Sequence, residues 1–136
     1  MRTIKAVIFD LDGTLVDSAP DIQVAINKLL AEEERRPLAL EEGLREARRW
    51  CAHARRASHE RHRRPEDLPT LTNRFLGFYD GHTTDLTRPY PGVPEALERL
   101  RSAGVRMGIC TNKPERPTRE LLSDLGLVPY FQVVFG

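Results

Sequence analysis

The chain has little cysteine and no long hydrophobic run. Its two cysteines, Cys51 and Cys110, lie far apart among 136 residues and match neither a zinc-binding nor a disulfide spacing. The first apolar run ends at Asp10, too early for the core of a signal peptide or for a membrane span. These absences exclude a disulfide-rich secreted scaffold, and we expect a soluble, cytoplasmic protein.

The chain also lacks an excess of charge of either sign. It has 21 basic and 20 acidic side chains, a formal net charge of +1. No global electrostatic field therefore favours a membrane or nucleic acid as partner, and a small molecule is the expected ligand. The length fits one domain.

Three short apolar runs rich in β-branched residues predict strands at residues 5–10, 105–110 and 131–135. Apolar residues at helical spacing predict one helix that closes at Gly104 and another that ends at Gly126. Strands that alternate with helices predict an α/β fold, a Rossmann-like parallel sheet in three layers with right-handed crossovers.

The segment after the first strand is predicted to be helical. Ser18 and Asp21 have the spacing of a capping box, which predicts a helix from there to about Glu33. Residues 35–88 show no strand pattern, so a helical cap inserted after the first strand is expected, with 21–87 as cap and 1–20 and 88–136 as core. Two apolar stripes predict its helices, namely Leu40, Leu44, Ala47, Cys51 and Ala54, and Leu71, Phe75, Phe78 and Tyr79.

Two aspartates, Asp10 and Asp12, follow the first predicted strand in the segment VIFDLDGTLVDS. In an extended chain, residues i and i+2 point to the same side, so both carboxylates can face one site at the carboxyl end of the strand. A divalent cation, most simply Mg²⁺, would keep both ionised. Gly13 would allow a tight turn, and the Thr14 hydroxyl would hold the carboxylates.

The pair suggests phosphoryl chemistry. A carboxylate is a competent nucleophile towards phosphorus, and a second one can protonate the leaving oxygen and later activate water. Thr111, Asn112 and Lys113 follow the second predicted strand, where a hydroxyl and free amides at a helix start suit an anionic phosphoryl group.

The motif D-L-D-G-T-L-V-D-S resembles the first signature of the haloacid dehalogenase-like superfamily of phosphatases and phosphotransferases. The resemblance implies that Asp10 is the nucleophile and Asp12 the general acid/base. It also implies that Mg²⁺ is held by the Asp10 carboxylate and the Asp12 carbonyl, and that Thr111 binds the transferred phosphoryl group.

Further segments resemble the phosphoglycolate phosphatase family: LTRPYPGV at 86–93, CTNKPE at 110–115 and LGLVPYF at 125–131. This implies hydrolysis of 2-phosphoglycolate to glycolate and phosphate through an aspartyl-phosphate, with the cap closing over the substrate. A sugar phosphate or another small phosphomonoester is the alternative substrate. Gly13, Thr14, Asn112 and Lys113 are the further residues expected on the phosphate side.

The resemblance also implies parts outside these 136 residues, namely a lysine that holds nucleophile and phosphate, and an acidic cluster that completes metal coordination. The first strand is central in that fold, so we expect an incomplete core with an exposed sheet edge, through which two copies could pair. An inactive fragment is the corresponding alternative to an enzyme. Lys113 is expected to contact phosphate and not to replace the absent lysine.

Residues 35–64 depart from the family pattern, because they hold ten arginines against four glutamates. A solvated arginine-rich helix face, a basic module for nucleic acid or another anion, and a compensated frameshift are the alternatives for this segment.

Overall fold

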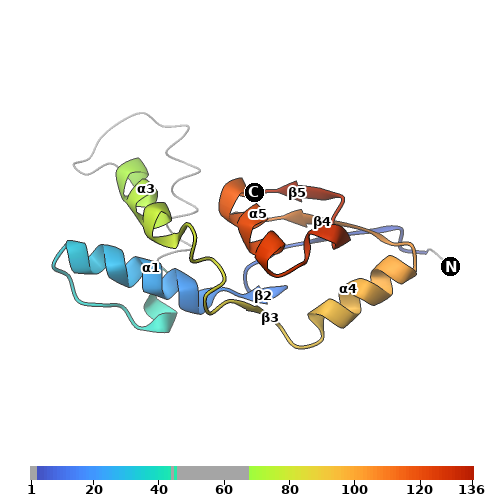
Figure 1. Ribbon diagram of the computed structural model, residues 1–136, viewed down its shortest axis with the longest axis horizontal. Coiled ribbons are helices and arrows are strands. Elements are labelled where there is room, and N and C mark those ends of the chain that lie inside the picture. The colour runs from blue at the N-terminus through green and yellow to red at the C-terminus, as the bar shows by residue number, and fades with distance from the viewer. Residues whose placement is uncertain (1–2, 44, 46–67) are drawn as a thin grey trace.

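The fold was obtained as a computed structural model, which describes residues 3–43, 45 and 68–136. Figure 1 shows helices α1 and α3 side by side at one end, and a sheet with helices α4 and α5 at the other. A short two-stranded ribbon lies between these two parts. In chain order the elements are β1 (Ala6–Phe9), β2 (Val16–Asp17), α1 (Ala19–Glu32), α3 (Leu68–Tyr79), β3 (Arg88–Pro89), α4 (Val93–Ser102), β4 (Arg106–Cys110), α5 (Glu115–Asp124), the 3-10 turn η1 (Val128–Tyr130) and β5 (Val133–Phe135).

The main sheet has three parallel strands in the order β1-β4-β5. Each arises within one of the apolar runs singled out in the sequence, with ends one or two residues shorter. The register places Phe9 beside Ile109, and Ile109 beside Val134. The predicted α/β class with a parallel sheet is therefore confirmed.

The core lies on one face of this sheet. Inward side chains of all three strands pack with leucines from both α4 and α5. Two successive right-handed crossovers in the same direction along a sheet place both helices on one face, which explains this one-sided packing. The fully buried residues of this core are Leu11, Leu15, Val16, Leu97, Met107, Ile109, Leu121, Leu122 and Leu127.

Glycines end the helices at the predicted places. Gly104 follows α4 with φ of 73°, and Gly126 follows α5 with φ of 67°. A positive φ suits glycine, which has no Cβ to clash in the left-handed region.

The capping box predicted at the start of α1 is wrong. Ser18 makes no side-chain cap; its hydroxyl donates instead to the carboxylate of Asp12. Asp21 does not reach back to Ser18 but accepts from the backbone N–H groups of Leu86 and Thr87. Partners distant in sequence thus replace the local hydrogen bonds that the spacing predicted.

The ribbon β2–β3 was not predicted. Its antiparallel register pairs Val16 with Pro89 and Asp17 with Arg88. Strands of two residues are too short to show an alternating pattern, so sequence periodicity cannot reveal them. The ribbon joins the chain leaving the sheet for α1 to the chain returning from α3.

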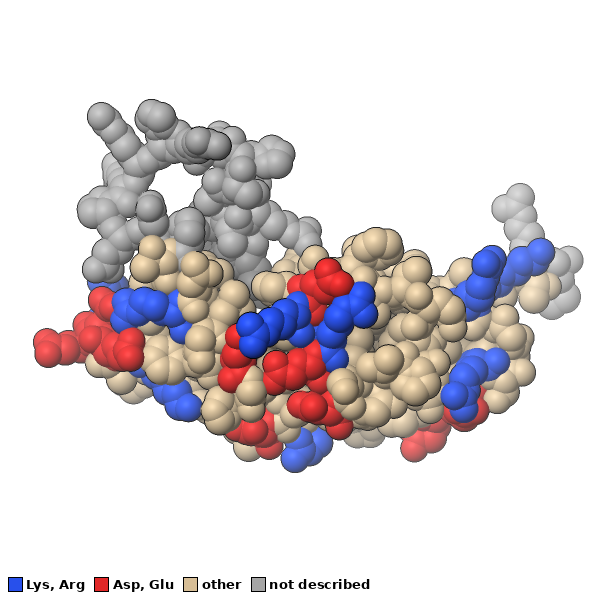
Figure 2. Space-filling model, turned by 45° about the horizontal axis from the view of Figure 1, so that its top comes forward, with Lys and Arg blue, Asp and Glu red and all other residues tan. Residues whose placement is uncertain are grey.

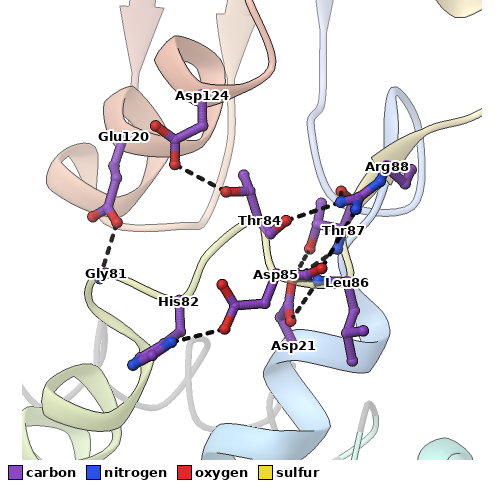
Figure 3. A network of polar contacts seen from close by, with 10 residues as sticks. All are labelled: Asp21, Gly81, His82, Thr84, Asp85, Leu86, Thr87, Arg88, Glu120 and Asp124. Atoms are coloured by element: carbon purple, nitrogen blue, oxygen red, sulfur yellow. Dashed lines mark hydrogen bonds and ion pairs between the residues drawn. The ribbon is translucent and has the colours of Figure 1, made fainter.

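A polar network fixes the segment that returns from α3 (Figure 3). The Gly81 N–H donates to Glu120 at 2.9 Å, and the Thr84 hydroxyl donates to Asp124 at 2.9 Å. Both acceptors lie on α5, so this segment is tied to the sheet part, while Asp21 ties it to α1.

Charged side chains of both signs are intermixed on the face seen in Figure 2. One contact of this kind joins the two helices at the other end of the molecule, where Arg74 of α3 lies 2.8 Å from Glu32 of α1.

Within the described ranges, no helix is long and apolar enough to cross a membrane. Most of the basic stretch 35–64, with most of the first predicted stripe, lies outside the described residues. The second stripe falls on α3, as predicted.

Candidate functional site

The two aspartates stand where the sequence predicts, directly beyond β1. Leu11 between them is fully buried in the core, while Asp10 is exposed and Asp12 is partly exposed. The Leu11 N–H donates to the Asp10 carboxylate at 2.7 Å. The alternation expected of an extended chain therefore turns Leu11 inward and both aspartates away from the core.

A tight loop follows the aspartates. Gly13 has φ of 76°, and its N–H donates to the Val16 carbonyl at 2.9 Å. The Leu15 N–H donates to the Leu11 carbonyl at 2.9 Å, so the chain folds back at once. The predicted turn at Gly13 is confirmed. The Thr14 side chain is exposed, and no contact recorded among the described residues links its hydroxyl to either carboxylate.

The carboxylate of Asp12 is held by one of its two oxygens. The Ser18 hydroxyl donates to Oδ1, and the Lys113 ammonium lies 3.3 Å from the same atom. Over the described part of the chain, no hydrogen bond or ion pair is recorded on Oδ2. With its side chain 28% exposed, Asp12 is oriented from the protein side and still accessible from the solvent side.

Lys113 is a buried cation at the centre of this arrangement. Its side chain is 5% exposed, and its ammonium donates to the Tyr79 hydroxyl at 2.7 Å. Burial acts to lower the pKa of Lys113, but the nearby Asp12 carboxylate and Tyr79 together raise it above its usual value. Burial also raises the pKa of Tyr79. The ammonium therefore stays charged and links α3 to the loop after β1.

Thr111 and Asn112 lie beyond β4, the strand beside β1. Thr111 is buried, its N–H donates to the Phe135 carbonyl at 2.9 Å, and its hydroxyl accepts from the Lys113 N–H at 3.2 Å. Asn112 is exposed. The structure thus brings Thr111 and Lys113 to the same edge of the sheet as Asp10 and Asp12, because the carboxyl ends of adjacent parallel strands share one edge.

The donor set suits a hard cation of the magnesium type. Two carboxylates stand two residues apart, and Mg²⁺ in proteins is commonly held by one or two carboxylates with water and substrate phosphate supplying the rest. In the part of the chain that the structure describes, no group of three or more acidic, histidine or cysteine side chains is placed to hold a metal ion. Asp10 and Asp12 are accordingly the residues that would hold such an ion.

Two residues of this site were missed in the sequence. The sequence pattern predicts Ser18 as a helix cap and Tyr79 as one member of an apolar stripe, whereas the structure places both against the site. The one local signal for Ser18 is its place six residues after Asp12, at the end of the segment that begins with DxDGT. No local signal identifies Tyr79, whose partner Lys113 lies 34 residues away.

Comparisons with known proteins show the family to which this chain is similar. The family model for haloacid dehalogenase-like hydrolases matches residues 4–136. The chain is 42% identical over 140 residues to a phosphoglycolate phosphatase of Cereibacter sphaeroides, covering 98% of this chain and 62% of that protein. It is 37% identical over 137 residues to the phosphoglycolate phosphatase of Caulobacter vibrioides, covering 96% of this chain and 56% of that protein.

A solved structure has the same fold. The crystal structure of a predicted phosphoglycolate phosphatase from Haemophilus somnus superposes with a TM-score of 0.78 at 26% identity, over all of this chain and 64% of that one. The chain therefore spans somewhat less than two thirds of the relatives it matches. Because the family model matches nearly its whole length, the chain belongs to the haloacid dehalogenase-like hydrolase family.

Proposed function

We propose that this chain carries the nucleophile and the acid/base of a magnesium-dependent phosphatase that hydrolyses a small phosphomonoester. One observation carries the proposal: an exposed carboxylate, Asp10, stands two residues before Asp12, whose carboxylate is held by Oδ1 alone. Such a pair offers one group for attack and a second, oriented group for proton transfer.

In the proposed reaction, a carboxylate oxygen of Asp10 attacks the phosphorus atom. The bond between phosphorus and the substrate oxygen breaks, and Asp12 gives its proton to that leaving oxygen. Asp12 then takes a proton from water, which attacks the aspartyl-phosphate, releases inorganic phosphate and restores the Asp10 carboxylate. In each step the accessible Oδ2 is the atom of Asp12 that exchanges the proton, because Ser18 and Lys113 occupy Oδ1.

The other residues of the site have supporting roles in this proposal. Thr111 and Asn112 bind the phosphoryl group, and Gly13 and Thr14 also contact it. Bound Mg²⁺, held by the Asp10 carboxylate and the Asp12 carbonyl, would neutralise charge on the phosphoryl oxygens. Lys113 serves chiefly to orient Asp12, since its ammonium is already engaged by Asp12 and Tyr79.

The proposed substrate is 2-phosphoglycolate, supported by the names of the relatives in Cereibacter sphaeroides and Caulobacter vibrioides. A sugar phosphate remains the alternative substrate. In keeping with the family, residues 21–87 would act as a cap over the core formed by 1–20 and 88–136. The pairing of α1 with α3 beside the site supports this division.

The test is phosphate release from 2-phosphoglycolate, glucose 6-phosphate and an aryl phosphate, each with and without Mg²⁺. We expect Mg²⁺-dependent release that is fastest with 2-phosphoglycolate and that is lost in Asp10→Asn. The matched control is Asp17→Asn, an exposed aspartate of β2, which should keep the activity. No release from any substrate by the folded chain would refute the proposal and favour an inactive fragment. Faster release from glucose 6-phosphate would refute the substrate.

A further inference from the structure

Tyr79, the last residue of α3, is a buried phenol that points toward the candidate site. It is 1% exposed, and its ring stacks on that of Phe75, one turn earlier in α3, with the ring centres 5.6 Å apart. A buried phenol hydroxyl needs a hydrogen-bond partner. Tyr79 finds this partner in the Lys113 ammonium at 2.7 Å, so the only polar atom of the side chain is used on the site.

The Lys113 ammonium stands between Tyr79 and Asp12. It lies 2.7 Å from the Tyr79 hydroxyl and 4.4 Å from the centre of the Tyr79 ring, and 3.3 Å from Oδ1 of Asp12. A lysine carries its charge on a flexible stem of four carbons, which does not fix the position of the ammonium by itself. The shorter contact comes from Tyr79. The position of the positive charge beside Asp12 therefore depends on the phenol.

The end of α3 is fixed to the sheet part of the molecule. The Asp80 carboxylate lies 3.5 Å from the guanidinium of Arg116, and the Gly81 N–H donates to Glu120 at 2.9 Å (Figure 3). Both partners lie on α5, one turn apart. These contacts follow Tyr79 directly in the chain, so its hydroxyl has a defined place relative to the core.

We propose that Tyr79 is a positioning residue for the acid step of the reaction. Through Lys113 it holds Asp12 in the orientation in which Oδ2 gives its proton to the leaving oxygen, while the bond between that oxygen and phosphorus breaks and the bond to Asp10 forms. The inference rests on the proposed phosphatase function and deepens it. It gives α3, which lies in the proposed cap, a part in orienting the acid.

The expected signature is a loss of rate that depends on the leaving group. A proton from Asp12 matters more for phenyl phosphate, whose leaving oxygen is strongly basic, than for 4-nitrophenyl phosphate, whose weakly basic anion departs without one. Tyr79→Phe keeps the ring and removes only the hydroxyl. We expect kcat/KM to fall about fivefold for phenyl phosphate and less than about twofold for 4-nitrophenyl phosphate. The two substrates share a ring, so differences in binding have little influence on the comparison.

A double-mutant cycle tests whether Tyr79 acts through Lys113. In a Lys113→Met background the hydroxyl has no ammonium left to position, so adding Tyr79→Phe should change kcat/KM for phenyl phosphate by less than about twofold. The matched control is Tyr130→Phe. It also removes a hydrogen-bonded hydroxyl, one that contacts Glu98 at 3.2 Å, and it lies before β5, at the edge of the sheet opposite to the site. This variant should leave both substrates unchanged, and circular dichroism confirms that each variant is folded.

An equal fall for both aryl phosphates in Tyr79→Phe would overturn the inference, because a merely structural role lowers both alike. An unchanged kcat/KM for phenyl phosphate in Tyr79→Phe would also overturn it, as would a fivefold loss that persists in the Lys113→Met background. In these cases the unaltered chain still releases phosphate and the proposed function stands. No release from either substrate by the unaltered, folded chain would refute the proposed function and this inference with it.

Discussion

Asp12, in the loop after β1, and Asp21, in the first turn of α1, differ sharply in their surroundings. Asp21, buried at 4% exposure, accepts from the N–H groups of Leu86 and Thr87 and from the Thr87 hydroxyl. Ser18 and Lys113 hold the Asp12 carboxylate through Oδ1 alone, and the Asp12 side chain is still 28% exposed to solvent. A carboxylate whose acceptor sites are all used inside the protein serves the fold, whereas one with a free oxygen can act on a ligand.

The first prediction tests the structural side of this comparison and has the largest effect on stability. Asp21→Ala leaves the N–H groups of Leu86 and Thr87 without their acceptor, so we expect a loss of about 3 kcal/mol in the free energy of unfolding. Urea denaturation measures it, with the exposed Asp17→Ala as control. A change below about 0.5 kcal/mol would show that Asp21 is not a structural clamp.

The second prediction sharpens the functional side. Lys113→Met removes the cation that orients Asp12, so kcat for phosphate release should fall about 100-fold with little change in KM. Tyr79→Phe keeps the ring and removes only the hydroxyl, and its effect should stay below about tenfold. Lys28→Met, at an exposed lysine of α1, is the control. A rise in KM at constant kcat would instead assign Lys113 to phosphate binding, the role predicted from the sequence.

The third prediction uses the pKa of Tyr79. Because burial raises the pKa of this phenol, it should deprotonate above the usual value of about 10. The folded state then binds more protons than the unfolded state, so stability falls as the pH rises through this window, and the raised pKa of Lys113 acts in the same direction. Tyrosinate absorbance, followed as the pH is raised, should show a step above the usual tyrosine pKa. Tyr79→Phe should remove this step, and Tyr90→Phe should leave it in place. A titration without such a step would contradict the buried contact.

The fourth prediction concerns two glutamates that are neither buried like Asp21 nor part of the candidate site, and the expected change in stability is the smallest. Arg74 contacts Glu32 and Glu33 at the surface between α3 and α1. Arg74→Ala should lower the melting temperature slightly at low salt, and high salt should erase the difference, because exposed ion pairs are screened. A large loss of melting temperature that persists in high salt would show that these contacts stabilise the fold as those of Asp21 do.

The sheet and the DxDGT loop could be predicted because their signals are local. A continuous apolar run predicts a buried strand, and Asp10 and Asp12 follow one such run directly. Thr111 could be placed for the same reason, since it follows the run that forms β4. Parallel topology then brings the two strand ends together.

The remaining contacts depend on residues far apart in the chain. Asp21 is paired with Thr87 across 66 positions, and Tyr79 with Lys113 across 34. The ribbon β2–β3 depends in the same way on residues that α1 and α3 separate along the chain. In the case of Ser18, the local spacing predicted a cap, but the Asp12 carboxylate competes successfully for its hydroxyl.

The central claim is that Asp12 serves chemistry and Asp21 serves the fold, and one paired measurement tests it. Asp12→Asn and Asp21→Asn make the same chemical change at the two positions, and each variant is assayed for both melting temperature and Mg²⁺-dependent phosphate release. We predict that Asp12→Asn abolishes release although the variant still folds, and that Asp21→Asn lowers the melting temperature while release persists below it. Persistent release in Asp12→Asn, or an unchanged melting temperature in Asp21→Asn, would contradict the account.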